Sequence, residues 1–138
     1  MSSLFVDTSG WASLFIHTQP HYPQAEQHFR LAFQQHRRIY TTNYVISELV
    51  ALLNSPLRVS RLRIFEIVDA IKTVAYVEII HIDDVTDALG WELCKSRLDK
   101  AWSLVDCTSF VVMQQLGIQE ALTTDKHFEQ AGFIRLLK

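Results

Sequence analysis

Long hydrophobic runs, cysteine motifs and flexible linkers are all missing from this 138-residue sequence. Every apolar run is far shorter than the roughly 20 residues that a membrane-spanning helix needs. The first residues also lack a basic segment followed by an apolar stretch of about 7 or more residues, because Asp7 interrupts it. We therefore expect a cytoplasmic protein with no membrane segment and no signal peptide.

The two cysteines, Cys94 and Cys107, form neither a CxxC motif nor a cysteine and histidine set at zinc-site spacing. We expect two buried thiols in a reducing compartment and no disulfide. No stretch rich in glycine, proline or serine divides the chain, and a chain of this length can bury about two thirds of its unfolded surface. The expected organisation is a single domain over residues 1–138.

The net charge of −2 offers little excess of lysine and arginine for a nucleic-acid partner. The balance changes if four acids are gathered in one metal site, because 11 acids then face 13 basic residues and the remaining surface carries +2. The basic residues include two groups along the chain: Arg58, Arg61 and Arg63, then Lys95, Arg97 and Lys100. Either group could be a solvated helix face.

Short apolar or β-branched segments alternate with stretches of helical periodicity. Strands are expected at residues 4–7, 39–42, 77–82, 119–123 and 133–137, and helices at 11–16, 21–38, 43–53, 58–73, 83–97 and 103–116. Asn43 and Asp83 are the expected N-caps of their helices. This alternation predicts an α/β fold with a mostly parallel sheet and helices on both faces. Trp11, Trp91 and Trp102 are expected in the core.

Four acids occupy positions where an acid needs an explanation. Asp7 and Asp125 each follow a predicted strand, at the end where α/β folds bind ligands. Glu48 shares a helical stripe with Val45, Leu49 and Leu52, and Asp106 shares one with Trp102, Phe110 and Met113. These stripes should face the core, where a carboxylate is costly unless it is paired, hydrogen-bonded or bound to a metal.

Each acid also has a structural alternative. Asp7 and Asp125 could cap the helices that follow them, and Ser103 with Asp106 matches a capping box. Glu48 could reach solvent from the edge of its stripe. No single alternative explains four acids from four elements, and their mutual repulsion calls for a cation. Because no histidine is expected among the ligands (His17, His21, His28 and His36 are interpreted as surface residues), a carboxylate site suits Mg²⁺ or Mn²⁺ and phosphoryl transfer.

The segments FVDTSGW, TTNYVISELVALL, DKAWSLVDCTSFVVM and ALTTDKHFEQAGF, in this order, resemble the PIN-domain ribonucleases. The sequence looks especially like the VapC-type toxins of toxin–antitoxin systems and their stand-alone relatives, over essentially the whole chain. The resemblance implies a PIN-like three-layer α/β/α sandwich with a short, mostly parallel sheet. It also implies an acidic pocket that holds one or two Mg²⁺ or Mn²⁺ ions and cleaves RNA.

The family's four acids correspond to Asp7, Glu48, Asp106 and Asp125, which are therefore the predicted catalytic and metal-binding residues. Thr8 offers a hydroxyl that could orient ligands, whereas Asp99 fits a pattern of close relatives and receives no role. Water is the expected nucleophile, with Glu48 either a ligand or the residue that orients this water. The resemblance further implies a homodimer and a small antitoxin whose tail enters the acidic pocket.

The predicted RNA-binding residues are basic side chains that could hold the phosphate backbone near the pocket: Arg58, Arg61, Arg63, Lys100 and Lys126. Three other functions remain open. A phosphatase with a strand-end aspartate nucleophile commonly needs a second aspartate where Ser9 stands. A receiver-like phosphoacceptor also groups acids around Mg²⁺, and a PIN-like fold could be retained as a non-catalytic RNA- or protein-binding module.

Overall fold

Strands and helices alternate along residues 2–138, the part of the chain that this computed structural model describes. The strands are β1 (Leu4–Val6), β2 (Ile39–Thr42), β3 (Val77–Ile80), β4 (Glu120–Leu122) and β5 (Ile134–Arg135). The helices are α1 (Thr8–Phe15), α2 (Tyr22–Gln34), α3 (Asn43–Asn54), α4 (Arg61–Thr73), α5 (Asp84–Ser96), α6 (Leu104–Leu116) and α7 (His127–Gln130). All the predicted strands and helices are present; β2 has the predicted ends, and each of the other predicted elements differs at one end or both. Among residues 2–138, no helix has the length and apolarity required to span a bilayer.

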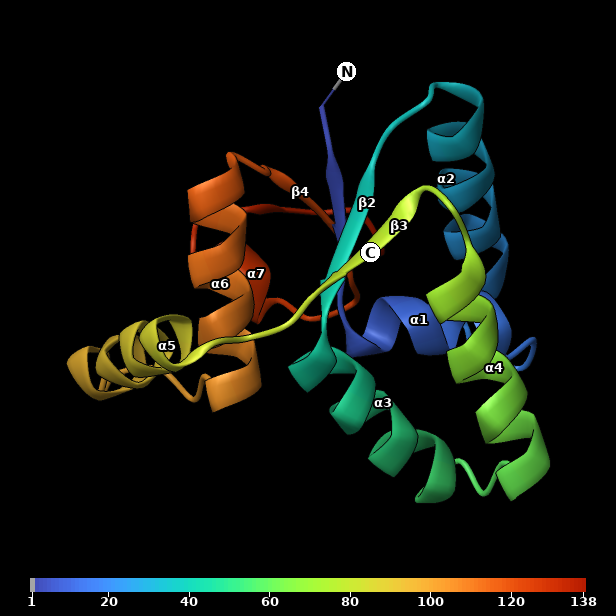
Figure 1. The fold of residues 1–138 in the computed structure, drawn as a ribbon, viewed down its shortest axis with the longest axis horizontal. Coiled ribbons are helices and arrows are strands. Elements are labelled where there is room, and N and C mark those ends of the chain that lie inside the picture. The colour runs from blue at the N-terminus through green and yellow to red at the C-terminus, as the bar shows by residue number, and fades with distance from the viewer. Residues whose placement is uncertain (1) are drawn as a thin grey trace.

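The five strands form one sheet in the order β3-β2-β1-β4-β5, and all neighbouring strands are parallel. The chain moves from β1 through β2 to β3, then returns past β1 to β4 and continues to β5. Right-handed crossovers therefore place α1–α4 and α5–α7 against opposite faces of the sheet, and Figure 1 shows these two groups on its two sides. The predicted α/β/α architecture is confirmed.

The reversal of direction creates a switch point between β1 and β4. These strands pair directly, with Val6 beside Leu122, yet their following connections leave toward opposite edges of the sheet. In parallel sheets, the crevice outside the carboxyl ends at such a point is where ligands bind. Asp7 follows β1 immediately and Thr123 follows β4, so both lie at this crevice.

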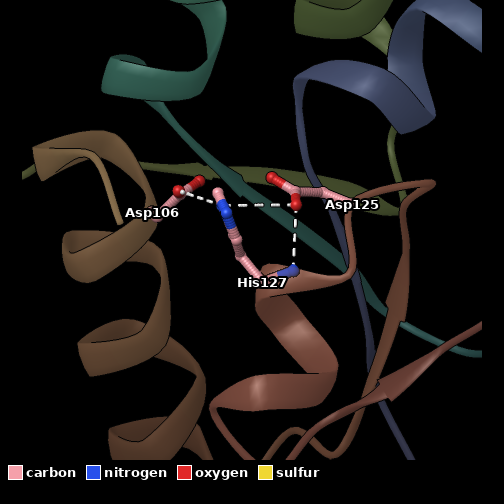
Figure 2. Close-up of side chains that lie close together, drawn as sticks. All are labelled: Asp106, Asp125 and His127. Atoms are coloured by element: carbon pink, nitrogen blue, oxygen red, sulfur yellow. Dashed lines mark hydrogen bonds and ion pairs between the residues drawn. The ribbon is translucent and has the colours of Figure 1, made fainter. Parts of the chain in front are cut away.

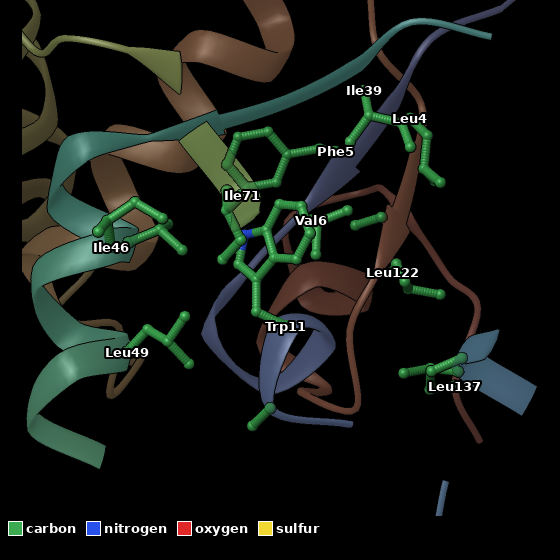
Figure 3. Packing of buried hydrophobic residues seen from close by; sticks show 14 of the residues in the cluster. Leu4, Phe5, Val6, Trp11, Ile39, Ile46, Leu49, Ile71, Leu122 and Leu137 are labelled. Carbon is green, nitrogen blue, oxygen red and sulfur yellow. The ribbon is translucent and has the colours of Figure 1, made fainter. Parts of the chain in front are cut away.

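The core surrounds the central strand β1, whose residues Leu4, Phe5 and Val6 are fully buried. Figure 3 shows Trp11 among these side chains, on the helix that follows the strand. The prediction for Trp11 is confirmed, but Trp102 is only half-buried and Trp91 is 53% exposed. Trp91 is excluded from the core because α5 packs on α6 through the neighbouring Gly90, where a Cβ atom would lie 2.5 Å from a Thr108 side-chain carbon.

Both cysteines are free thiols, as predicted, and Cys107 is buried. The prediction that Cys94 is buried is wrong, because it is only partly covered. It lies near the end of α5, with its sulfur 3.5 Å from the carbonyl oxygen of Ser103. The connection between α5 and α6 therefore covers one side of this thiol.

The predicted cap of α3 is displaced by one residue. Thr42 is the N-cap, because β2 runs directly into α3 and Thr42 is the last extended residue; its hydroxyl accepts a 3.1 Å hydrogen bond from the Val45 amide. Asn43 instead accepts a 2.7 Å bond from the Ile82 amide and ties α3 to the segment after β3. Asp83 caps α5 as predicted, with a 2.8 Å bond from the Thr86 amide.

Gly10 sets how closely α1 approaches β4. A Cβ atom at this position would lie 2.0 Å from the backbone oxygen of Leu122, a distance that no side chain can occupy. Only glycine permits this contact between the first turn of α1 and the end of β4. The contact holds Asp7, which caps α1, beside Thr123, which follows β4.

Candidate active site

The four predicted acids meet at the carboxyl edge of the sheet. They line a cavity of about 220 Å³ together with Thr8, Ser9 and Leu52. Asp7 comes from the end of β1, Glu48 from α3, Asp106 from α6 and Asp125 from the loop after β4. The structure therefore brings together four carboxylates that lie as much as 118 positions apart in the sequence.

Asp7 both caps a helix and faces the cavity. Its Oδ1 accepts hydrogen bonds of 2.9 Å from the Gly10 amide and from the Ser9 hydroxyl. Its Oδ2 accepts a 2.7 Å bond from the Thr123 hydroxyl. The capping alternative is thus correct for Asp7, and it does not remove the residue from the cavity, because a carboxylate has about four acceptor positions.

Burial raises the pKa of Asp7 to about 7, and the nearby charge of Asp125 adds to this effect, while the three hydrogen bonds oppose it. Within residues 2–138, no lysine or arginine forms an ion pair with Asp7 or Glu48. A buried carboxylate with only neutral partners is unfavourable in its charged form. A cation in the cavity would supply the missing compensation.

Two hydroxyl groups connect the ends of β1 and β4. The Thr123 hydroxyl, which donates to Asp7, also accepts a 2.9 Å bond from the Asp125 amide. The Ser9 hydroxyl, which also donates to Asp7, accepts a 2.9 Å bond from the Thr124 amide. Sequence analysis missed Ser9 and Thr123 as parts of the site, although a hydroxyl residue two positions from each strand-end acid was a visible signal.

Glu48 on α3 is partly exposed. It is therefore neither fully buried on the core-facing stripe nor fully in solvent, the two positions expected from the sequence. The Thr8 hydroxyl donates a hydrogen bond to Glu48 Oε1. This contact joins the first turn of α1 to α3 and holds the Glu48 carboxylate at the cavity wall. Thr8, whose hydroxyl was expected to orient ligands, therefore lies at the site, where it contacts Glu48.

Asp106 forms the capping box predicted as its structural alternative. Its Oδ2 accepts a 3.1 Å bond from the Ser103 amide, and its own amide donates a 3.0 Å bond to the Ser103 hydroxyl. Burial raises the pKa of Asp106, the Asp125 charge adds to this effect, and hydrogen bonding from Ser103 and His127 opposes it. The two roles coexist, because the carboxylate that closes the first turn of α6 also lines the cavity.

Asp125 does not occupy the N-cap position of α7, where Lys126 stands. Its Oδ1 instead accepts a 2.9 Å bond from the His127 amide. The His127 ring lies between two of the acids, with Nδ1 at 3.1 Å from Asp106 Oδ2 and 3.3 Å from Asp125 Oδ1 (Figure 2). Sequence analysis did not consider His127, whose only signal is its position two residues after a strand-end acid.

The five basic residues predicted to bind RNA do not line the acidic cavity. Arg58, Arg61, Arg63 and Lys126 are exposed, and Lys100 is partly covered. Arg61 stacks over Phe65 at 5.2 Å, and Arg63 pairs with Glu66 at 3.2 Å. Asp99 also lies away from the cavity lining and binds the Arg97 guanidinium through two bonds of 3.0 and 3.1 Å.

The donor set fits a divalent cation. Asp106, Asp125 and His127 each offer one ligand atom, and these atoms lie within 4.8 Å of one another. Asp7 and Glu48 add carboxylate oxygens on the same cavity, and oxygen donors of this kind hold Mg²⁺ and Mn²⁺ in proteins. The uncompensated buried charge of Asp7 and the convergence of the acids both favour such an ion.

Comparison with known protein families identifies the family to which this chain belongs. The sequence profile of the PIN domain family matches residues 4–134. This chain is a member of the PIN domain family. The resemblance drawn from the four sequence segments is therefore confirmed, and the match spans all five strands and all seven helices of the PIN protein, apart from the last residue of β5.

Two further comparisons concern a VapC toxin. The PIN protein is 32% identical over 133 residues to the 23S rRNA-specific endonuclease VapC20 of Mycobacterium tuberculosis, covering 96% of this chain and 97% of that one. The crystal structure of VapC20, described as a sarcin–ricin loop cleaving toxin, matches with a TM-score of 0.85 and 30% identity over 99% of this chain and 100% of the other. A crystal structure from Pyrobaculum aerophilum matches with a TM-score of 0.62 at 14% identity, over 98% and 84% of the two chains, and shows the fold alone.

Proposed function

We propose that this PIN protein is a metal-dependent endoribonuclease and the toxin of a toxin–antitoxin pair. One observation carries the proposal: carboxylates from four elements meet at one cavity, and the most buried of them, Asp7, has no cationic partner among residues 2–138. The likeness to VapC20, an endonuclease of 23S rRNA, supports the reaction class. Residues 1–138 act as a single PIN domain in this proposal.

Asp7, Asp106 and Asp125 are the proposed ligands of Mg²⁺ or Mn²⁺, and Glu48 either binds the ion or orients the attacking water. When bound, the divalent ion polarises the scissile phosphate and lowers the pKa of a water molecule. Thr123 and Ser9 hold the Asp7 carboxylate in place through their hydroxyls. Thr8 does the same for Glu48. The water oxygen forms a bond to phosphorus, the bond from phosphorus to one ribose oxygen of the backbone breaks, and this leaving oxygen takes up the proton that the water gives up.

Arg58, Arg61, Arg63, Lys100 and Lys126 remain the proposed contacts to the RNA backbone, outside the cavity itself. Because sequence-independent phosphate contacts position the substrate and carry no sequence information, these residues would affect affinity more than cleavage position. A small antitoxin, a homodimeric state and a cytoplasmic location complete the proposal, and all three rest on the family resemblance and on the likeness to VapC20.

The direct test is RNA cleavage by the purified protein with Mg²⁺, with Mn²⁺ and with excess EDTA, using 23S rRNA and an unrelated structured RNA as substrates. We expect cleavage with at least one of the ions and none with EDTA. Activity that persists in EDTA, or full activity in Asp7→Asn, would overturn the mechanism.

The same test separates the strongest alternative, a PIN fold that only binds RNA or protein. A binding module would retain RNA without cleaving it under any ion, whereas the proposed enzyme converts the RNA to discrete fragments. The receiver-like and phosphatase alternatives lose their support with the PIN family match.

A further inference from the structure

His127 places an imidazole at one wall of the acidic cavity. Its Nδ1 atom faces both Asp106 Oδ2 at 3.1 Å and Asp125 Oδ1 at 3.3 Å, and Figure 2 shows the ring between the two carboxylates. The three side chains are all largely buried, with exposed fractions of 24% for His127, 14% for Asp106 and 32% for Asp125. Their shared polar contacts point to a common function.

The spacing of these atoms matches the edges of a coordination polyhedron. Neighbouring ligands in an octahedron around an ion at about 2.1–2.2 Å are about 3.0 Å apart. The two nitrogen–oxygen distances, 3.1 and 3.3 Å, are close to this value. An ion beside the three side chains could therefore bind Nδ1 and both carboxylates with small adjustments.

The protein fixes the imidazole before any ion binds. The His127 amide donates to Asp125, and the next residue, Phe128, is fully buried against Phe110, with ring centroids 4.9 Å apart. The capping box holds Asp106 on the facing helix. Ligands that are held by hydrogen bonds and packing need little reorganisation when they bind a metal.

We propose that His127 is a nitrogen ligand of the metal site and that it makes the site select a first-row transition ion such as Mn²⁺ over Mg²⁺. The inference rests on the proposed function, because it assumes that the acidic cavity holds the catalytic ion. Imidazole binds first-row transition ions well, whereas Mg²⁺ keeps oxygen ligands and several waters. The affinity gained from one nitrogen should also increase from Mn²⁺ to Co²⁺.

A purely structural role for His127 is the competing explanation. In that case the ring only donates hydrogen bonds to Asp106 and Asp125 and never binds an ion. The variant His127→Asn separates the two roles, because the asparagine amide can still donate from a position near Nδ1 but offers no imidazole nitrogen. His81→Asn is the matched control, since His81 is exposed in the segment between β3 and α5.

The test measures the ligands of bound Mn²⁺ directly by electron spin-echo modulation, and the affinities for Mg²⁺, Mn²⁺ and Co²⁺ by calorimetry. In the wild-type protein and in His81→Asn we expect ¹⁴N modulation from a coordinated imidazole. In His127→Asn this signal should disappear, with a loss of at least about tenfold in Mn²⁺ affinity, a larger loss for Co²⁺, and less than about twofold for Mg²⁺.

Three results would overturn the inference: bound Mn²⁺ without nitrogen modulation, modulation that persists in His127→Asn, or equal losses of affinity for all three ions. In each of these cases Mn²⁺ still binds, so the proposed nuclease remains intact. If none of the three ions binds to the wild-type protein, the metal-dependent function and the inference fail together. A variant that does not fold is recognised by circular dichroism, and the wild-type spin-echo measurement then decides alone.

Discussion

The acids at the two ends of the central sheet have different partners. At the amino end, Glu120 on β4 pairs with Arg37 at 2.5 Å, and Glu78 on β3 pairs with Arg38 at 3.0 Å. At the carboxyl end, Asp7 and Glu48 receive only hydroxyl and amide hydrogen bonds within residues 2–138. The first set is neutralised inside the chain, whereas Asp7 and Glu48 have no lysine or arginine partner among residues 2–138, as expected of acids that bind a cation from solution.

This contrast teaches how to separate structural acids from functional ones. When a carboxylate has an arginine partner, any contribution that the pair makes is to the stability of the fold. A buried carboxylate without one lowers stability and is retained for what it binds. Variants at the two ends of the sheet should therefore have opposite effects on stability and on activity.

The largest expected effect is that of Asp7→Asn. Cleavage of RNA should fall by at least about 10³-fold, because the variant loses a metal ligand whose contribution is several kcal/mol. The unfolding free energy of the metal-free protein at pH 8 should rise by about 2–4 kcal/mol, since the buried charge disappears. Cleavage assays and urea denaturation measure the two changes.

The sign of that stability effect follows from the raised pKa of Asp7. Below about pH 4 the carboxyl is protonated in both folded and unfolded chains, so it costs nothing. Between about pH 4 and 7 the unfolded chain ionises first, and the folded protein progressively loses stability as the pH rises.

The matched control for Asp7→Asn is Glu120→Gln at the amino end of the sheet, which should change cleavage less than twofold. Equal losses of activity in the two variants would remove the distinction between the ends.

Thr123→Val should have the next largest effect, a decrease of about 10- to 100-fold in kcat/KM. The variant removes the hydroxyl that donates to Asp7 and accepts from the Asp125 amide, and it should cost about 1–3 kcal/mol of stability. Because a hydrogen bond that lowers the pKa of Asp7 is lost, the midpoint of the pH profile should shift upward.

Thr41→Val is the control for this substitution. The Thr41 hydroxyl is also buried, donates to the Val6 carbonyl at 2.8 Å and accepts from the Trp11 indole at 3.1 Å. It should lose a similar amount of stability with no shift in the pH midpoint. If both threonine variants shift the midpoint equally, Thr123 has no specific role at Asp7.

A third effect is a pH dependence of metal affinity. Metal binding requires the ionised carboxylate, and the pKa of Asp7 is raised to about 7 by burial. The apparent Mn²⁺ affinity should therefore rise by up to about tenfold for each pH unit below 7 and level off above it. Calorimetric titrations from pH 5.5 to 8.5 measure this profile, and an affinity that stays flat from pH 5.5 to 7 would argue against Asp7 as a ligand.

The smallest effect on function is expected at the amino end of the sheet. Arg37→Gln removes the ion pair with Glu120 and the guanidinium bonds to the Ser2 and Ser3 carbonyls. We expect a loss of about 1 kcal/mol in unfolding free energy and a change in cleavage rate below twofold. A tenfold loss of cleavage would show that this end of the sheet also serves the reaction.

The sequence was sufficient to predict the acids of the site but not the groups that hold them. Asp7 and Asp125 could be predicted because strand ends are visible in the hydrophobic pattern. The bonds of Ser9 and Thr123 depend on the pairing of β1 with β4, which local periodicity does not encode. The position of the His127 ring depends on where the short α7 packs. Trp91 is exposed because α5 packs on α6 through Gly90, so that Trp91 lies on the side of α5 that faces away from α6.

The central claim is that Asp7 and the other acids at the carboxyl end of the sheet hold a divalent ion. Titration of Mn²⁺ into the purified protein at pH 7.5, with free ion measured by electron paramagnetic resonance, tests it most directly. The account predicts saturable binding of one or two ions in the wild-type protein and at least about a hundredfold weaker binding in Asp7→Asn, with Glu120→Gln unchanged. Equal Mn²⁺ binding by the wild-type protein and Asp7→Asn would contradict it.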